Sequence, residues 1–387
     1  AYVNRLYSLP VPDKKLDQFR KLHDMAMFVV PLLLFVSLVQ ISRGENENAA
    51  AIIVLTKLGW WTLPWALVLF GFGGLVLTIL TRLLRVRPPA FELVTREIID
   101  VEQELGYRPQ GEGPYQRLLK VPGNQAFTFE LSEKKFTFSK LHDDLHELTI
   151  LHLSDLHFIG TIDRPYFEML CEKAAKWNPD LVVFTGDLID RQELTSWLPT
   201  TLGKLSAPLG CHYILGNHDW HLDCELIRQQ MQELGWQDCA GTVTEVNHRQ
   251  GTIHIGGDER PWMGKAPQFK QDDNAFKLLL SHTPDNFPWA KKQGIDLMLS
   301  GHNHGGQVVL PLIGPLYSPS RYGVRYAGGE FYSSGTTMHV SRGVSGKHPL
   351  RINCRPEVTL IHLLKRAETV KMTKAERLSE IALAPAG

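Results

Sequence analysis

Three apolar runs, LTILHL, LVVFT and CHYIL, are each followed within a few residues by side chains that can bind metal ions or move protons. Such a run predicts a buried strand, and open α/β sheets place their sites just beyond the carboxyl ends of strands. We therefore expect these side chains to lie close together. They are Asp155, His157, Asp187, Asn217 and His218.

Two later runs add imidazoles in the same position, His282 after FKLLLS and His302 with His304 after LMLS. Taken singly, an aspartate after a strand more often caps the next helix, and a histidine is more often an ordinary surface or core residue. Together the set offers carboxylates, a carboxamide and imidazoles without a thiolate. That chemistry suits Mn²⁺, Fe or Zn²⁺, and seven donors suit two ions that share a bridging carboxylate.

The spacing of the clusters predicts the elements that position them. Asp155 and Asp187 are 32 residues apart, and Asp187 and Asn217 are 30 apart. Each interval has the length of one strand–helix–strand unit. Helical patterns over Pro165–Trp177 and His221–Leu234 fit this arrangement, so the sequence predicts an α/β fold.

Five blocks of this sequence, SDLH, GDLID, GNHD, SHTP and GHNH, resemble the motifs of the calcineurin-like metallophosphoesterase superfamily. The resemblance extends over Phe127–Leu364. It implies an α/β sandwich of two mixed sheets flanked by helices, and a dinuclear metal-dependent hydrolase of phosphoric esters or pyrophosphates. In this family the nucleophile is a hydroxide held between the two ions. By the same resemblance one ion would be bound by Asp155, His157 and His304, the other by Asn217, His282 and His302, with Asp187 bridging both.

Two further residues are expected beside the metals. The resemblance implies that His218 contacts the scissile phosphate, and as an imidazolium it would stabilise the transferring phosphoryl group or protonate the leaving oxygen. Asp219 would orient His218 or its loop, although capping of the following helix is an equal alternative. Mn²⁺ is the ion we expect first, with Zn²⁺ and Fe as alternatives.

The run GGQVVLPLIGPLYSPSRYGVRYAGGEFY resembles the membrane-associated bacterial branch of this superfamily, which includes UDP-2,3-diacylglucosamine diphosphatase-type enzymes of lipid A biosynthesis. This implies a lipid-linked nucleotide substrate. Arg342, Arg321 and Arg325 stand among glycines and tyrosines and could grip a second phosphate, or they could be solvated surface residues. The alternatives are a broad phosphodiesterase or phosphatase for soluble substrates and a non-catalytic scaffold.

Two uncharged apolar stretches, about 25–41 and 58–80, are long enough to cross a bilayer as helices, and tryptophans mark the start of the second. They predict an N-terminal membrane region over 1–87. Basic residues flank the pair, which places both ends on the cytoplasmic side of an inner membrane. A buried helical hairpin in a soluble fold, or a signal peptide for the first stretch, is the competing interpretation.

The remaining segments frame a catalytic domain over 126–366. In the connector 88–125, Phe91–Leu105 has the spacing of a short amphipathic helix and Gly106–Gly123 that of a loop. Alternating residues on both sides of Ser132-Glu133-Lys134 predict a β-hairpin. The tail 367–387 carries no predicted chemistry.

Composition excludes several classes of protein. The 41 basic and 41 acidic residues cancel, which disfavours a nuclease or another nucleic-acid partner. The five cysteines form no CxxC pair, which argues against disulfides and thiolate metal sites and favours a reducing compartment. No protein partner is evident. The expected partners are a membrane and a phosphorylated small molecule.

Overall fold

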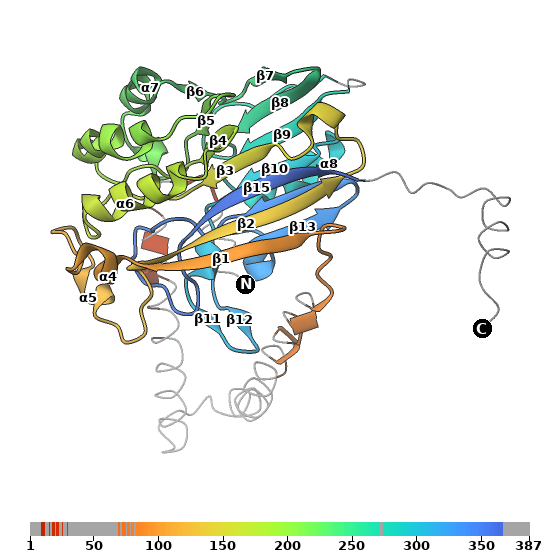
Figure 1. Cartoon of the computed structure of the whole chain (residues 1–387). Coiled ribbons are helices and arrows are strands. Elements are labelled where there is room, and N and C mark those ends of the chain that lie inside the picture. The colour runs from red at the N-terminus through yellow and green to blue at the C-terminus, as the bar shows by residue number, and fades with distance from the viewer. Residues whose placement is uncertain are drawn as a thin grey trace, which may run out of the picture.

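Two β-sheets packed face to face form the centre of the molecule (Figure 1). The computed structural model describes residues 83–270 and 274–366, with scattered residues between 9 and 80. The first sheet has seven strands in the order β1-β2-β15-β3-β4-β5-β6. Their bounds are β1 Glu92–Asp100, β2 Thr128–Phe138, β15 Glu357–Lys365, β3 Thr149–Leu153, β4 Leu181–Thr185, β5 Cys211–Ile214 and β6 Trp236–Asp238.

The second sheet has six strands in the order β13-β14-β10-β9-β8-β7, and a separate two-stranded hairpin is formed by β11 and β12. Both large sheets are mixed: β3, β4, β5 and β6 run parallel, as do β8, β9, β10 and β14, while the remaining neighbours include antiparallel pairs. The bounds are β13 Gly329–Ser333, β14 Thr336–Val340, β10 Leu297–Ser300, β9 Phe276–Ser281, β8 Gly251–Asp258, β7 Val243–His248, β11 Val309–Leu310 and β12 Gly314–Pro315.

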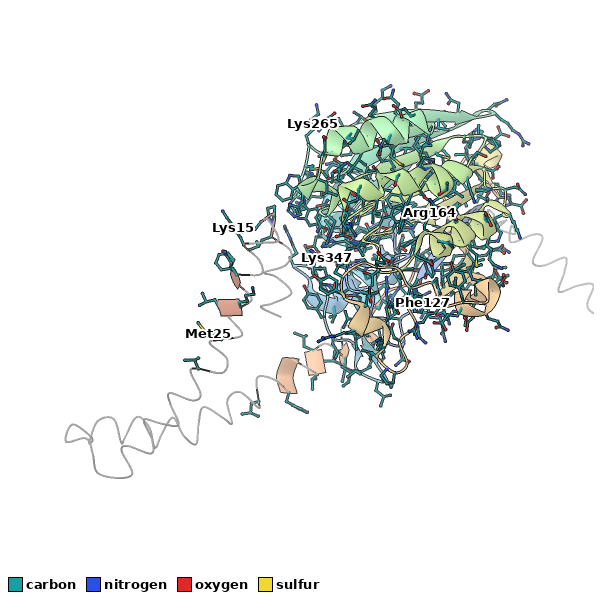
Figure 2. The ribbon with its side chains drawn as sticks, turned by 90° about the vertical axis from the view of Figure 1, so that its left-hand side faces the viewer. Lys15, Met25, Phe127, Arg164, Lys265 and Lys347 are labelled. Carbon is teal, nitrogen blue, oxygen red and sulfur yellow. The ribbon has the colours of Figure 1, made fainter. Side chains whose placement is uncertain are left out.

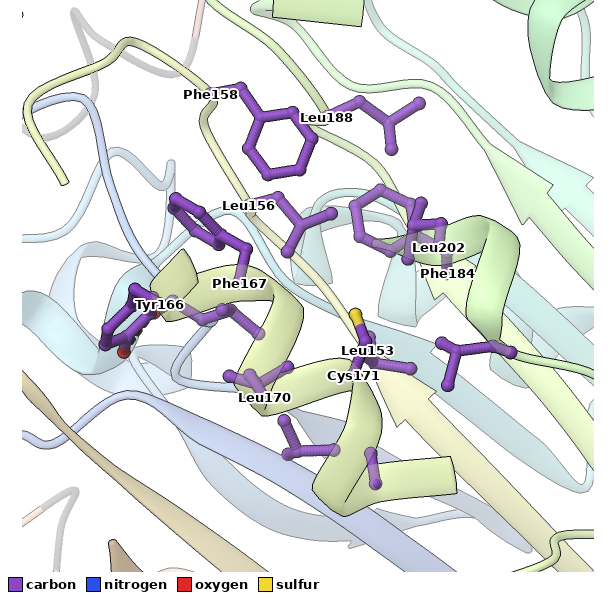
Figure 3. Close-up of a cluster of buried hydrophobic side chains, with 14 of the residues drawn as sticks. Leu153, Leu156, Phe158, Tyr166, Phe167, Leu170, Cys171, Phe184, Leu188 and Leu202 are labelled. Atoms are coloured by element: carbon purple, nitrogen blue, oxygen red, sulfur yellow. Dashed lines mark hydrogen bonds between the residues drawn. The ribbon is translucent and has the colours of Figure 1, made fainter. Parts of the chain in front are cut away.

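Helices cover the outer faces of this sandwich, in agreement with the α/β fold predicted from the sequence. Side chains of α6, with Arg164 labelled at its first residue in Figure 2, pack against the first sheet in the cluster drawn in Figure 3. Phe287 and Ala290 of α8 pack against the second sheet. The bounds are α4 Val101–Leu105, α5 Gln116–Leu119, α6 Arg164–Ala175, α7 Cys224–Glu233 and α8 Phe287–Lys292.

The predicted membrane spans, 25–41 and 58–80, lie mostly outside the described residues. Among the residues that the structure does describe, no helix combines the length and the apolar character needed to cross a bilayer.

The amphipathic helix predicted over Phe91–Leu105 is wrong for most of its length. Residues 92–100 form β1, an edge strand paired antiparallel with β2, and only the last five residues are helical. The segment carries the β-branched residues Val94, Thr95, Ile98 and Ile99, which suit a strand as well as a helix. The unpaired edge of β2 supplies backbone hydrogen bonds that outweigh the weak helical spacing.

The predicted hairpin around Ser132-Glu133-Lys134 is also wrong, because β2 runs through it without a turn. These residues lie in mid-strand, with β1 on one side and β15 on the other. Ser132 shares a hydrogen bond with Thr359, and the Lys134 ammonium lies 3.2 Å from Glu330 of the second sheet. Ser132 and Lys134 therefore have buried partners, and none of the glycine or asparagine that two-residue hairpins require is present.

Two buried histidines also meet between the sheets, His152 of β3 and His339 of β14, with ring centroids 5.3 Å apart. His152 Nε2 hydrogen-bonds Thr185, whereas neither ring nitrogen of His339 has a hydrogen-bond partner in the described part of the chain. Burial lowers the pKa of His152 to about 3. Burial, with the charge of Lys134, holds the pKa of His339 well below its usual value.

This arrangement predicts that the fold loses stability in mild acid. As pH falls below about 6.5, the unfolded chain takes up a proton at residue 339 that the folded chain refuses, so the free energy of unfolding drops. Each such histidine contributes about 2 kcal/mol of loss at pH 5 relative to pH 7.5. His339→Leu should reduce the pH-dependent loss by that amount in urea unfolding at both pH values.

The flanking charges Lys134, Arg342, Glu330 and Glu357 remain in place in this variant, so they do not account for the difference. His248→Leu, at the end of β7, is the matched control, because it removes a half-buried imidazole that lies outside the contact between His152 and His339. An unaltered pH dependence in His339→Leu would contradict this assignment.

Candidate metal centre

The carboxyl ends of five strands, three from the first sheet and two from the second, converge on one cluster of side chains. Apolar residues of these strands, among them Ile150, Val183, Leu280 and Leu299, pack against each other in the core between the sheets. That packing brings the strand ends together. Asp155 and His157 follow β3, Asp187 follows β4, Asn217 and His218 follow β5, His282 follows β9, and His302 and His304 follow β10.

Five of the seven predicted ligands stand in the left-handed region of the backbone. Left-handed conformations are uncommon for non-glycine residues and concentrate at functional sites. Here they turn the chain sharply after each strand, so that closely spaced ligands both enter the cluster. The φ angles are 57° at Asp155, 47° at His157, 60° at Asp187, 66° at His302 and 48° at His304.

Glycines make room for these turns. A Cβ added at Gly186, which has a φ of 94°, would lie 2.7 Å from His282 Nδ1. A Cβ at Gly216 would collide with the carboxylate of Asp187. The glycines of the GD and GN blocks therefore let the backbone approach the ligands closely.

One group of donors consists of Asp155, His157, Asp187 and His304, whose ligand atoms all lie within 4.8 Å of one another. His157 Nε2 is 3.3 Å from Asp187 Oδ2 and 3.9 Å from Asp155 Oδ1. His304 Nε2 is 3.7 Å from Asp155 Oδ1. All four side chains are buried or nearly so.

The second group shares Asp187 with the first and adds His282 and His302. His282 Nε2 lies 3.3 Å from Asp187 Oδ2 and 3.1 Å from the amide oxygen of Asn217. Asp187 therefore stands between the two groups, where a bridging carboxylate would be. The structure brings together the same two sets of residues that the sequence motifs imply.

The imidazoles are held by their second nitrogens, so each presents a defined nitrogen to the cluster. His282 Nδ1 donates to the Thr185 carbonyl at 2.7 Å, and His302 Nε2 donates to the Pro319 carbonyl at 3.0 Å. His304 Nδ1 lies 3.1 Å from the Ser345 carbonyl. Histidines that bind metals are oriented in this way by carbonyls and carboxylates.

The donors fit divalent metal ions. His157 Nε2 and His304 Nε2 face each other at 3.2 Å while their other nitrogens are engaged. Two lone pairs in that arrangement repel unless a cation lies between them. Nitrogen and oxygen donors without a thiolate suit Mn²⁺, Fe or Zn²⁺.

The carboxylates and imidazoles of the cluster shift one another's pKa values. Burial raises the pKa of Asp155. Burial also acts to raise the pKa of Asp187, but the charges of His282, His218 and His157 outweigh it and hold that pKa well below its usual value. Asp187 is therefore ionised and ready to bind cations.

Asp190 was missed by the sequence analysis although it contacts two residues of the site. Its Oδ2 accepts from His157 Nδ1 at 2.8 Å and its Oδ1 from His218 Nδ1 at 2.6 Å. Burial acts to raise the pKa of Asp190, but His218 and His157 lower it far below its usual value. The signal was present in the block GDLID, whose second aspartate follows Asp187 by three residues.

Asp219 lies behind the cluster and acts on backbone rather than on an imidazole. Its buried carboxylate accepts hydrogen bonds from the amides of Asp187, Leu188, Ile189 and Gly216 at 2.8 to 3.2 Å. It thereby fixes the loops after β4 and β5. The cap of α7 is Asp223, so the helix-capping alternative for Asp219 is wrong.

The three predicted substrate arginines are not part of the donor groups. Arg342 is paired with Glu357 at 2.6 Å and Glu130 at 2.8 Å, so its charge is already compensated. Arg321 is exposed, with its Nε 3.7 Å from Asp285. Arg325 stacks on Tyr326, 5.2 Å from the ring centroid.

Sharing of Asp187 predicts a pattern of metal loss. The wild-type chain should bind about two divalent ions, and Asp155→Ala and His282→Ala should each retain about one, because each removes a ligand of one group only. Asp187→Ala should lose both. Mass-spectrometric metal analysis after equilibration with Mn²⁺ or Zn²⁺ measures this, with Asp223→Ala at the α7 cap as control. Retention of both ions by Asp187→Ala would contradict the bridging position.

Comparison with known proteins agrees with this geometry. The family model described as calcineurin-like phosphoesterase matches residues 148–306, which contain the whole cluster. The phosphodiesterase YaeI of Escherichia coli is 29% identical over 242 residues, covering 61% of this chain and 88% of that protein. The uncharacterized metallophosphoesterase YkuE of Bacillus subtilis is 30% identical, covering 60% and 85%.

A further relative is the UDP-2,3-diacylglucosamine pyrophosphatase LpxG of Chlamydia muridarum, 25% identical over 61% of this chain and 89% of that protein. The matched regions cover most of each relative's length. The chain therefore belongs to the calcineurin-like metallophosphoesterase family and is a metal-dependent phosphoester hydrolase.

Proposed function

We propose that this hydrolase cleaves a phosphodiester or pyrophosphate bond of a lipid-linked nucleotide, such as UDP-2,3-diacylglucosamine, on the cytoplasmic face of a membrane. The observation that carries the hydrolytic part is the meeting of six donor side chains with Asp187 at their centre, with His218 beside them. The similarity to LpxG and the two apolar N-terminal stretches support the lipid-linked substrate.

The site residues divide into ligands and a proton donor. Asp155, His157, Asp187 and His304 would hold one ion, and Asp187, Asn217, His282 and His302 the other. Two bound divalent ions, for which we propose Mn²⁺, would supply Lewis-acid stabilisation of the phosphoryl oxygens and would lower the pKa of water.

His218 would protonate the leaving oxygen through Nε2, because Nδ1 is hydrogen-bonded to Asp190. The ionised carboxylate of Asp190 stabilises the imidazolium form that proton donation requires. It also fixes the ring beside His157, 4.6 Å between centroids. Asp219 keeps the loop before His218 in position, while Arg321 is the proposed contact for a second phosphate.

Soluble phosphodiesters form the second candidate substrate class. The similarity to a protein named as a phosphodiesterase, YaeI, favours it. Nothing in the donor set discriminates between the two classes, because both present the same phosphoryl centre to the cluster.

The proposed proton transfer predicts a dependence on the leaving group. His218→Ala should reduce kcat by about 10²- to 10⁴-fold on an alkyl phosphodiester, because an alkoxide needs a proton to leave. The reduction should be much smaller on a p-nitrophenyl ester, whose leaving group departs unprotonated. Asp190→Asn should show the same trend with a loss of about 10- to 100-fold.

Asp223→Asn, which preserves the cap of α7 on a nearby loop, is the control and should match wild type. Metal content measured in parallel separates a lost ion from a lost proton donor. Equal losses on both ester types would refute the acid role of His218.

Direct comparison of substrates tests the lipid assignment. Purified full-length chain with Mn²⁺ should turn over UDP-2,3-diacylglucosamine with a higher kcat/KM than bis-p-nitrophenyl phosphate or UDP-glucose. Efficient hydrolysis of the soluble esters with no turnover of the lipid nucleotide would overturn the lipid-linked proposal and support the second candidate.

A further inference from the structure

A leucine stands at the tip of the β11–β12 hairpin with its side chain almost wholly in solvent. Leu312 is 93% exposed and its φ is 66°, a conformation that glycine or asparagine would adopt with less strain. Exposed apolar side chains scattered singly are ordinary, but this one belongs to a group. Leu316, just after β12, is 53% exposed.

The chain that precedes β1 reaches the same surface. Leu83 and Leu84 are each 75% exposed and Val86 is 60% exposed. Leu84 and Val86 line a pocket of about 500 Å³ together with Ile313 and Pro315 of the hairpin. The segment is anchored there, because the Tyr332 amide donates to the Val86 carbonyl and Arg85 lies over the ring of Phe331. We use the name hairpin surface for the β11–β12 hairpin, residues 83–86 and this pocket together.

The hairpin surface is basic. Among the described residues, four cationic side chains line the pocket and no carboxylate does. Arg85 is paired with Glu330, and Arg342 with Glu130 and Glu357. The other two, Lys291 and Arg325, have no carboxylate partner among the described residues and lie against the rings of Phe287 and Tyr326. Exposed leucines with uncompensated cationic side chains beside them are complementary to an anionic lipid surface, which offers an apolar interior and charged phosphates.

The hairpin is connected at both ends to the metal centre. It begins just after His304, and its return strand leads to Pro319, whose carbonyl accepts the hydrogen bond from His302. A Cβ at Gly306 would lie 2.6 Å from the Pro315 side chain, so the hairpin packs directly on the turn after His304. Gly305 of that turn lies in the pocket wall.

We propose that the hairpin surface docks on an anionic phospholipid bilayer, with Leu312 and Leu316 inserted at the headgroup level and Arg325 and Lys291 against lipid phosphates. This contact is made by the hairpin of the catalytic domain together with residues 83–86, and both lie outside the two apolar stretches 25–41 and 58–80. It sets the loop that bears His302 and His304 close to the lipid surface. The contact does not depend on which ester is hydrolysed.

The test places a fluorescent reporter on the tip. Full-length Leu312→Cys, labelled with an environment-sensitive dye, is reconstituted into vesicles of phosphatidylcholine with or without phosphatidylglycerol. With the anionic lipid we expect a blue-shifted emission and about threefold stronger quenching by shallow spin-labelled lipids than at a control site. High salt should reduce the effect, because it screens the lipid charge.

Lys265→Cys is the matched control position. Lys265 is exposed and is labelled at the top of the molecule in Figure 2, whereas β11 and β12 lie at the bottom in Figure 1, and the views differ only by rotation about the vertical axis. The wild-type chain measures labelling of the native cysteines, of which four are buried and Cys224 is partly exposed. Arg325→Glu added to the labelled protein should weaken the response to phosphatidylglycerol.

Three results would overturn the proposal. The dye at 312 could remain as accessible to aqueous iodide as the dye at 265. Its response could be the same with and without phosphatidylglycerol. It could also shift in detergent without lipid as the chain self-associates, which would identify a second copy as the occupant of this surface. All three leave the hydrolase activity in solution untouched, so failure here is distinct from failure of the proposed function.

Discussion

Two carboxylates and four imidazoles are buried where the strand ends of two sheets meet, and the rest of the structure follows from how that charge is held. Burying an unpaired carboxylate is costly, so every charge here needs partners. Asp155 and Asp187 meet this requirement partly through the backbone: the amide of His302 donates to Asp155 and that of His218 to Asp187. The two carboxylates thus also join loops that follow different strands. The same hydrogen bonds that shape the site therefore help to hold the strand ends together.

Two further buried carboxylates, Asp219 and Asp190, hold the residues of the cluster in place. Asp219 accepts four backbone amides and fixes the loops on which Asp187 and His218 stand. Asp190 accepts from two imidazoles and decides which nitrogen each presents. Asp219 positions backbone, whereas Asp190 positions imidazole rings. Both affect the reaction only through the residues that they hold. Such outer partners commonly matter to metal affinity and activity nearly as much as the ligands.

Further from the metals, an ion network links the two sheets to the chain that enters the domain. Glu357 pairs with Arg342 and Lys134, and Lys134 also reaches Glu330, which in turn meets Arg85. Breaking a buried pair leaves an uncompensated charge at a cost of about 3–5 kcal/mol, so these partners are fixed relative to one another. Arg85 belongs to the segment that borders the hairpin surface, while Arg342 is next to Gly343, which packs on Asp155. The network therefore fixes the segment before β1, the hairpin surface and the metal centre in position relative to one another.

The donor residues, the α/β class and helices α6 and α7 could be predicted from the sequence, because each depends on a local pattern: a ligand just past its own strand, or an apolar stripe at helical spacing. The sequence did not indicate that residues 92–100 pair as a strand, that β2 continues through Ser132–Lys134, or that Arg342 is held by Glu130 and Glu357. Those outcomes depend on partners far away in the chain, such as Thr359 for Ser132. The contact of Asp190 with both His157 and His218 is of the same kind. Periodicity depends on neighbouring residues and can be read from the sequence. Strand pairing and charge pairing depend on residues far apart in the chain, which meet only when the two sheets pack together.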